Sequence, residues 1–319
     1  MKKTLLALSV LAAGSAQAGI NLYDADGVIV DLSAAAEVQY LQPIQSDKSN
    51  DDAGIHLDDG DLQLNTTIAV TSQLNAVGGI GFAFEKSEVT NDELWVGLGS
   101  ADFGTLTFGR QLLISDDAGI GKDYELGFEQ LDFLAGTEGS ETIKYVFDNG
   151  QFYFGVSHDL DAEGAEPASD FLNTNGTITD ARLGARFADF DVRGYYYTAE
   201  SASTVANKVE IDGFNLEGEY VMGAFAFAAS YGNVEQKVAG ATLTDVDLIE
   251  LAGSYTMGKN TFALGYNRAD DDDNTVDNVY ANVTHKLHSN VKVYGELGWA
   301  DSDATDLDVG YLVGMEVLF

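Results

Sequence analysis

Apolar and polar residues alternate with a period of two over most of the chain after residue 18. In the segment 62–70, for example, Leu62, Leu64 and Ile68 share one face. Because every second side chain of a β-strand points to the same side, this alternation predicts half-buried strands. The pattern recurs in residues 142–147, 152–157, 182–187, 291–299 and 311–319. No stretch of this part approaches about 18 uninterrupted apolar residues, which excludes membrane-spanning helices.

Connections of two lengths separate these segments. Asp148-Asn149-Gly150 is the strongest of the short turn signals, because Asn-Gly reaches positive φ at low cost. Longer polar segments alternate with the short turns and span residues 42–60, 86–91, 111–138, 160–177, 200–209, 236–244, 269–277 and 302–306. We count about sixteen strands in this alternation. Tight turns at one end and long loops at the other are typical of a transmembrane barrel.

Two further patterns distinguish a membrane barrel from a β-sandwich. Charged side chains share one strand face with small residues, which a sandwich core would not tolerate. Aromatic residues gather at strand ends, as at membrane interfaces; they are Phe103, Phe108, Phe147, Phe152, Phe190, Tyr220, Phe225, Trp299 and Phe319. Pairing of the last strand with the first would remove the edge that lipid cannot hydrate. The sequence therefore predicts an all-β, 16-stranded antiparallel transmembrane β-barrel, with a secreted β-sandwich or solenoid as the alternative.

The N-terminus has the pattern of an export signal. Met1-Lys2-Lys3 is a short basic head, residues 4–13 are apolar, and Ala16-Gln17-Ala18 supplies the small residues of a cleavage site. The apolar run is too short for a membrane anchor, which needs roughly 20 residues. We therefore predict a signal peptide over residues 1–18, cut after Ala18, and one barrel domain over residues 19–319 in the outer membrane.

Composition excludes several functional classes. The chain has 52 acidic and 16 basic residues, and its formal charge of −36 argues against nucleic-acid binding. The absence of cysteine excludes disulfides, thiolate zinc sites and a thiol nucleophile. The four histidines form no known catalytic motif, so we predict neither an enzyme nor a cofactor. A hydrolase built on a barrel, with His158-Asp159 as its suggestive pair, is an alternative.

Short segments of the chain resemble a known family. Tyr23-Asp24-Ala25-Asp26-Gly27 before the first strand, Asp102 to Arg110 before the longest early loop, and the terminal Phe319 are similar to the general trimeric porins of Gram-negative bacteria. The resemblance implies a homotrimer in contact with outer-membrane lipid and lipopolysaccharide. It also implies an inward-folded third loop, here residues 111–138, and makes Arg110 a candidate trimer contact.

The chain also departs from that family. Enterobacterial porins place acidic loop residues opposite a ladder of basic wall residues. The corresponding positions here are Ala35, Thr66, Asp92 and Glu138, and none is basic. The resemblance therefore supports the fold better than it supports a transverse electric field across the constriction of this chain.

Because alternate residues of a strand face opposite sides, the position of each charged residue in its strand predicts whether it faces the lumen. The acidic wall residues would be Asp31, Glu37, Glu85, Glu93, Asp191, Glu217, Glu219, Glu250, Glu296 and Glu316, and the basic ones Lys144, Arg182, Arg186, Arg193 and Lys292. The predicted constriction loop adds Asp116, Asp117, Lys122, Asp123, Glu125, Glu129, Asp132 and Glu138. A water-filled passage with this acidic excess concentrates cations and repels anions. We therefore predict a channel for ions and small hydrophilic solutes that prefers cations.

Some interpretations stay open at this point. Arg182, Arg186 and Arg193 could form a positive face opposite the acidic loop, or could neutralise neighbouring carboxylates. The acidic runs 47–61 and 270–273 favour weak, diffuse binding of divalent cations at the surface over a dedicated site. The long loops would also suit a surface adhesin or receptor.

Overall fold

The computed structural model describes residues 19–45, 53–85, 89–160, 176–201 and 208–319. The predicted signal peptide lies outside these residues and stays a prediction. Within the described part of the chain, no helix has both the length and the apolar character needed to cross a membrane.

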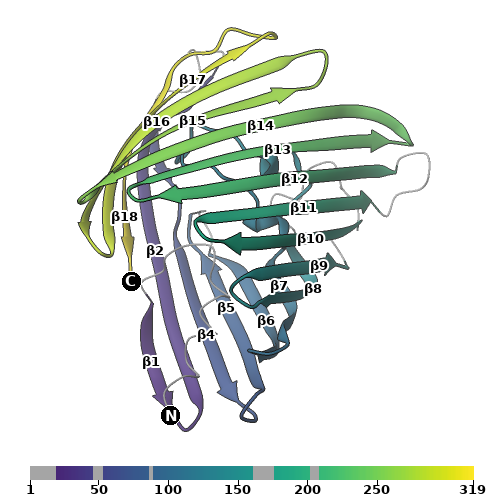
Figure 1. Cartoon of the computed structure of the whole chain (residues 1–319), viewed down its shortest axis with the longest axis vertical. Helices are drawn as coiled ribbons and strands as arrows, with labels where there is room; N and C mark the ends of the chain where they lie inside the picture. The colour runs from purple at the N-terminus through teal and green to yellow at the C-terminus, as the bar shows by residue number, and fades with distance from the viewer. Residues whose placement is uncertain (1–18, 46–52, 86–88, 161–175, 202–207) are drawn as a thin grey trace.

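The strands form one antiparallel sheet that closes into a ring of sixteen strand positions. They are β1 (Ile20–Ala25), β2 (Val28–Gln42), β3 (Gly54–Leu57), β4 (Asp61–Ala69), β5 (Asn75–Ala83), β6 (Thr90–Ser100), β7 (Gly104–Leu112), β8 (Glu138–Asp148), β9 (Phe152–Asp159), β10 (Gly176–Phe187), β11 (Phe190–Ser201), β12 (Val209–Met222), β13 (Phe225–Val238), β14 (Ala241–Met257), β15 (Asn260–Asp270), β16 (Thr275–His288), β17 (Val291–Ser302) and β18 (Gly310–Leu318). β3 and β4 pair with the same strand, β2, and share one ring position. The predicted 16-stranded antiparallel barrel is confirmed, and Figure 1 follows it from purple β2 to yellow β18.

The ring closes at β2. β18 pairs with the second half of this strand, and β1 pairs with its first half on the same side. Between them, the N–H of Ala34 donates to the carbonyl of Phe319 at 2.6 Å, and the N–H of Phe319 donates back at 2.9 Å. β1 and β18 thus occupy one ring position (Figure 1). Pairing of the last barrel strand with the first is confirmed, whereas the sequence pattern did not predict β1.

The connections confirm some predicted turns and correct others. Asp148-Asn149-Gly150 joins β8 to β9, with Gly150 at φ 89°. Two predicted long loops are wrong. Most of residues 236–244 belong to β13 and β14, and only Ala239 and Gly240, with φ values of 53° and 78°, form the turn between them. Likewise, only residues 271–274 of the predicted loop 269–277 connect β15 to β16. β13 and β14 continue past the expected ends because their polar side chains bond to each other, for example Thr242 to Glu235 at 2.8 Å.

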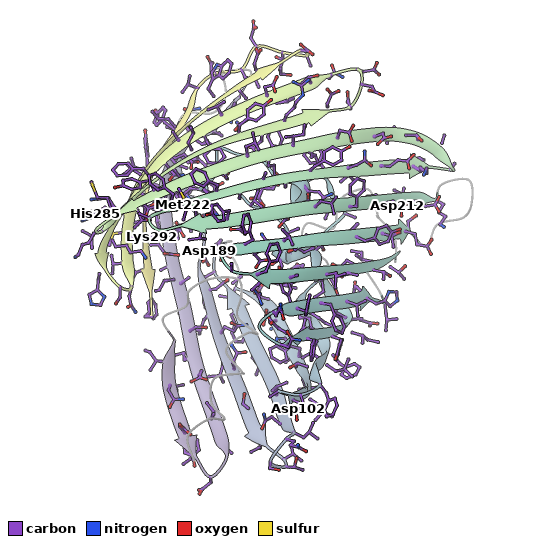
Figure 2. All side chains as sticks on the ribbon, viewed as in Figure 1. Asp102, Asp189, Asp212, Met222, His285 and Lys292 are labelled. Carbon is purple, nitrogen blue, oxygen red and sulfur yellow. The ribbon has the colours of Figure 1, made fainter. Side chains whose placement is uncertain are left out.

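One face of the strands is exposed and apolar. Its side chains include Val38, Tyr40, Leu94, Val96, Leu183, Leu216, Leu251, Leu264, Leu297 and Val313, and Leu183 is 68% exposed. Aromatic rings follow the short-turn ends of β10–β14. Phe190 stacks on Tyr220 with centroids 4.4 Å apart, and Phe225 lies 4.7 Å from Tyr255. Figure 2 shows Asp189 and Met222 at this end of the barrel and Asp212 towards the other.

The opposite face is buried and largely polar, and the segment between β7 and β8 packs on it. We call residues 113–137 L3; it contains the 3-10 turns η2 (Ser115–Asp117) and η3 (Gln130–Phe133). Leu113 and Ala135, near the two ends of L3, are fully buried in one cluster with Ile178 of β10. The predicted bounds 111–138 were too wide, because β7 extends to Leu112 and β8 begins at Glu138.

Candidate functional site

Side chains on the buried strand faces hold the backbone of L3. The N–H of Ile114 donates to Ser157 of β9 at 2.9 Å, and the N–H of Ser115 donates to Asp180 of β10 at 2.6 Å. Further along, the N–H of Gly119 donates to Glu217 of β12 at 2.6 Å. Carboxylate acceptors suit these backbone donors because charge-assisted hydrogen bonds are the stronger class.

Glu296 of β17 holds the far part of L3. Its carboxylate accepts the N–H groups of Tyr124 at 2.8 Å, Glu125 at 3.1 Å and Leu126 at 2.9 Å. The ring of Tyr124 also stacks on Tyr294 of the same strand, with centroids 3.6 Å apart. L3 is therefore attached to the buried face from β9 to β17.

Two of the predicted arginines, Arg182 of β10 and Arg193 of β11, contact L3 directly. Arg193 pairs with Glu217 and with Glu219 at 2.7 Å, and it also donates to the carbonyl of Gly119 in L3 at 3.0 Å. Arg182 pairs with Asp117 of L3. The structure therefore lends no support to the interpretation of a positive face opposite the acidic loop. It favours the other one, in which these arginines neutralise neighbouring carboxylates.

The remaining basic wall residues also have partners. Arg186 pairs with Asp148 at 2.7 Å and with Asp191 at 3.1 Å. Lys292, labelled in Figure 2, lies 3.1 Å from Glu316 and 4.0 Å from Glu37. Lys144 of β8 donates to the carbonyl of Leu112, the residue before L3, at 2.8 Å. Lys122, within L3, lies 3.8 Å from Glu219 of the wall.

A second group of carboxylates lies around β3, β4 and β6. The ligand atoms of Asp59, Asp61 and Glu85 lie within 4.8 Å of one another. Glu85 was predicted on the wall but lies beyond the end of β5, where it accepts the N–H of Gly60 at 2.7 Å. Glu93 accepts hydrogen bonds from Gln63 at 2.5 Å and Trp95 at 2.8 Å. Among the described lysines and arginines, none forms an ion pair with Asp61, Glu85 or Glu93.

Two related groups lie beside these carboxylates. Glu37, Asp59 and Glu316 form one group, next to Lys292. The other joins His56 and Asp58 to Glu125 of L3. Gln39 of β2 donates to Asp58 at 2.7 Å and to Glu125 at 3.3 Å, so it bridges the two carboxylates. L3 and the segment before β4 therefore meet at Gln39.

The other predicted loop residues mostly bond within L3. Asp123 accepts the N–H of Gly127 at 2.8 Å, Glu129 accepts that of Gly121 at 2.8 Å, and Asp132 accepts that of Glu129 at 2.9 Å. Glu138 is the first residue of β8, not part of the loop. These carboxylates therefore shape L3 as well as charging it.

Four other predicted residues are Asp31, Arg110 and the pair His158-Asp159. Asp31 is exposed and accepts a hydrogen bond from Asn21 at 2.8 Å. Arg110 donates to the carbonyl of Asn91 at 2.8 Å, and its role as a trimer contact stays a prediction. The structure does not bring His158 and Asp159 together as a catalytic pair: neighbouring strand residues face opposite sides, and His158 bonds to Thr179 at 2.8 Å.

Sequence reasoning missed several residues that hold L3. Asp180 lies two residues before Arg182, so the alternation could have placed it on the same buried strand face. Its role in holding L3 nevertheless depends on Ser115, which lies 65 positions earlier in the chain. Tyr195 donates to the carbonyl of Asp117 at 2.7 Å, and Asn282 donates to that of Lys122 at 2.6 Å. No local pattern marks Asn282 as a partner of L3.

Asp116 makes the base of L3 sensitive to pH. Burial raises its pKa to about 6, the charge of Asp117 adds to the rise, and the hydrogen bond from Thr137 at 3.0 Å opposes it. The folded protein therefore retains a proton that the unfolded chain, with an ordinary pKa of 3.8, releases. The resulting stabilisation is fully present below pH 3.8 and is lost as the pH rises through about 6.

We therefore expect Asp116→Asn to remove part of the fall in stability between about pH 4 and about pH 7. The part removed is on the order of 3 kcal/mol at most, because one pKa unit corresponds to about 1.4 kcal/mol. Thermal unfolding in detergent at several pH values measures it, with Asp272→Asn in an exposed turn as the control. An unchanged pH profile in Asp116→Asn would contradict the assignment.

Comparison with known proteins places the chain in a family. A family model described as Gram-negative porin matches residues 4–305. Porin-like protein H of Photobacterium profundum is 51% identical over 337 aligned positions, covering 100% of both chains. The trimer form of OmpT of Vibrio cholerae matches with a TM-score of 0.74 and 20% identity, over 92% of this chain and 100% of that one.

An anion-selective porin from Comamonas acidovorans matches similarly, with a TM-score of 0.75 and 16% identity, over 92% of this chain and 100% of that one. At such identities the solved structures establish the fold alone. The family model and the relative from Photobacterium, by contrast, extend over almost the whole sequence. This chain belongs to the Gram-negative porin family of outer-membrane β-barrels.

Proposed function

We propose that the protein forms a water-filled channel for passive diffusion of ions and small hydrophilic solutes, with a preference for cations. L3 lies in the lumen and narrows the passage. The hydrogen bonds that attach L3 to Asp180, Glu217 and Glu296 support this position, because all three acceptors lie on the buried strand face. The open part of the lumen then lies between L3 and the wall formed by β4–β6.

The distribution of paired and unpaired charges carries the proposed selectivity. Arg182, Arg186, Arg193 and Lys292 all lie within ion-pair distance of carboxylates, so their fields are largely cancelled. The carboxylates beside β4–β6, by contrast, form no ion pair with the described lysines and arginines. Their net negative field enriches cations, because at physiological salt it extends over the Debye length of about 8 Å into the passage.

The fold does not decide the sign of the selectivity, since the structural relatives include an anion-selective porin. The side chains of this chain are therefore what supports the proposal. We also propose a homotrimer, as in the trimer form of OmpT, and export directed by residues 1–18. Porins are channels rather than enzymes, and no feature of the described residues favours a hydrolase. The receptor alternative depends partly on residues 161–175, which lie outside the described chain.

The reversal potential of the channel in planar bilayers under a KCl gradient tests the selectivity. We expect a cation-selective sign, and we expect the double variant Asp61→Asn, Glu85→Gln to lower the cation-to-anion permeability ratio severalfold. Asp272→Asn, in an exposed turn, is the matched control and should leave the ratio almost unchanged, since exposed charges are screened. An anion-selective wild type, or equal effects of the two variants, would overturn the proposal.

A further inference from the structure

A row of buried oxygen atoms crosses the wall behind L3. Ser230 of β13 lies directly opposite Glu250 of β14, and Glu250 lies directly opposite Asn267 of β15. These are three neighbouring strands in Figure 1. Ser230 is 7% exposed, Glu250 1% and Asn267 2%. Side chains that face each other across neighbouring strands have Cβ atoms about 5 Å apart, so their oxygens converge.

These oxygens lack partners among the described residues. Ser230 Oγ, both carboxylate oxygens of Glu250 and Asn267 Oδ1 complete no hydrogen bond there. The backbone N–H of Gln130 in L3 lies near the Glu250 carboxylate. A buried carboxylate without a counter-charge is costly, whereas the other acidic wall residues have partners. Glu296, for example, accepts three backbone N–H groups.

L3 brings further negative charge to this row. Glu129 and Asp123 of L3 lie close enough for their charges to act on Glu250. One oxygen of Glu129 accepts the N–H of Gly121 at 2.8 Å, and the carboxylate lies so close to Gly119 that a Cβ there would clash with Oε2. Ile120 of L3 is buried against the wall beside this carboxylate. Because Gly119 and Gly121 have no side chains, the carboxylate of Glu129 fits between L3 and the strands.

We propose that Glu250, Asn267 and Ser230 of the wall, together with Glu129 of L3, bind one divalent cation of the calcium type. Every contributing atom is an oxygen, which selects a hard cation. Ca²⁺ accepts six to eight oxygens in irregular geometry, whereas Mg²⁺ demands an octahedron and retains water, which suits a buried cage poorly. The cation neutralises the two carboxylates and attaches L3 to β13–β15. The site is independent of the selectivity proposed above.

The test uses the purified full-length protein in detergent, first treated with a chelator and then titrated with CaCl₂ alone. We expect the unfolding temperature to rise by roughly 5 °C at saturating Ca²⁺. We expect calorimetry to give one site per subunit, and MgCl₂ at the same concentration to produce a smaller rise. Glu250→Gln, which preserves shape, should abolish the rise, and Glu129→Gln, which leaves the strands untouched, should reduce it.

Asp272→Asn is the control for diffuse binding at acidic surface turns and should respond to Ca²⁺ like the wild type. The proposal is overturned if the wild type does not respond to Ca²⁺, because Glu250 is then simply buried in its protonated form. It is also overturned if Glu250→Gln and Glu129→Gln both keep the full response, or if the response is lost in Asp272→Asn.

Discussion

Replacing Arg193 with methionine is expected to destabilise the barrel by about 3–5 kcal/mol, the cost of leaving a buried charge without its partner. The side chains of Arg193 and Glu217 are 13% and 0% exposed, so solvent screens this pair little. The change also removes the bond from Arg193 to the carbonyl of Gly119 in L3. Urea unfolding of the detergent-solubilised protein measures the loss.

Arg268→Met is the matched control, because Arg268 also pairs with two carboxylates but has a 37% exposed side chain. We expect it to cost less than about 1 kcal/mol. The double variant Arg193→Met, Glu217→Gln should recover most of the loss, since glutamine still accepts from Gly119 without leaving a buried charge. Equal losses for Arg193→Met and Arg268→Met would contradict the assignment of a buried pair.

Replacing Glu296 with alanine is expected to release the far part of L3. The change removes the acceptor of three backbone N–H groups that L3 has at Tyr124, Glu125 and Leu126. Hydrogen bonds to a charged acceptor contribute about 1.5–3 kcal/mol each and are not additive, so we expect a loss on the order of 3–5 kcal/mol. Because L3 narrows the proposed channel, single-channel conductance should rise as well.

Tyr124→Phe is the control for this experiment. It removes only the hydroxyl contact with Thr284 at 2.7 Å and keeps the aromatic ring that stacks on Tyr294. We expect a cost of about 1 kcal/mol and an unchanged conductance. If Glu296→Ala loses stability without any change in conductance, L3 does not form the constriction of the channel.

Much of the fold could be predicted from local pattern. Alternation with a period of two identifies the strands, and Asn149-Gly150 identifies a turn, because both depend on backbone geometry within a few residues. The failure at residues 236–244 has a physical cause. Where β13 and β14 extend far from the aromatic end of the barrel, polar residues such as Lys237, Thr242 and Thr244 interrupt the alternation, so the strands resemble a loop in composition. The pairing of the two strands, through the backbone and through side-chain bonds, distinguishes them.

The pairing of charges could not be predicted. Arg193, Glu217 and Glu250 all have the parity of the buried face, yet two of them form an ion pair and the third has no counter-charge among the described residues. The alternation along a strand predicts which face a side chain lies on, but it does not predict the height of that side chain in the barrel or which residues surround it. Those depend on strand register and on where L3 lies.

The alternation of the strands, the closure of the ring and the acidic excess follow directly from residue type, spacing and the need to satisfy backbone hydrogen bonds. Which charges are cancelled and how L3 is held depend instead on the folded barrel. The main attachments of L3 join residues 43–172 positions apart, and contacts over such separations exist only once the barrel has closed.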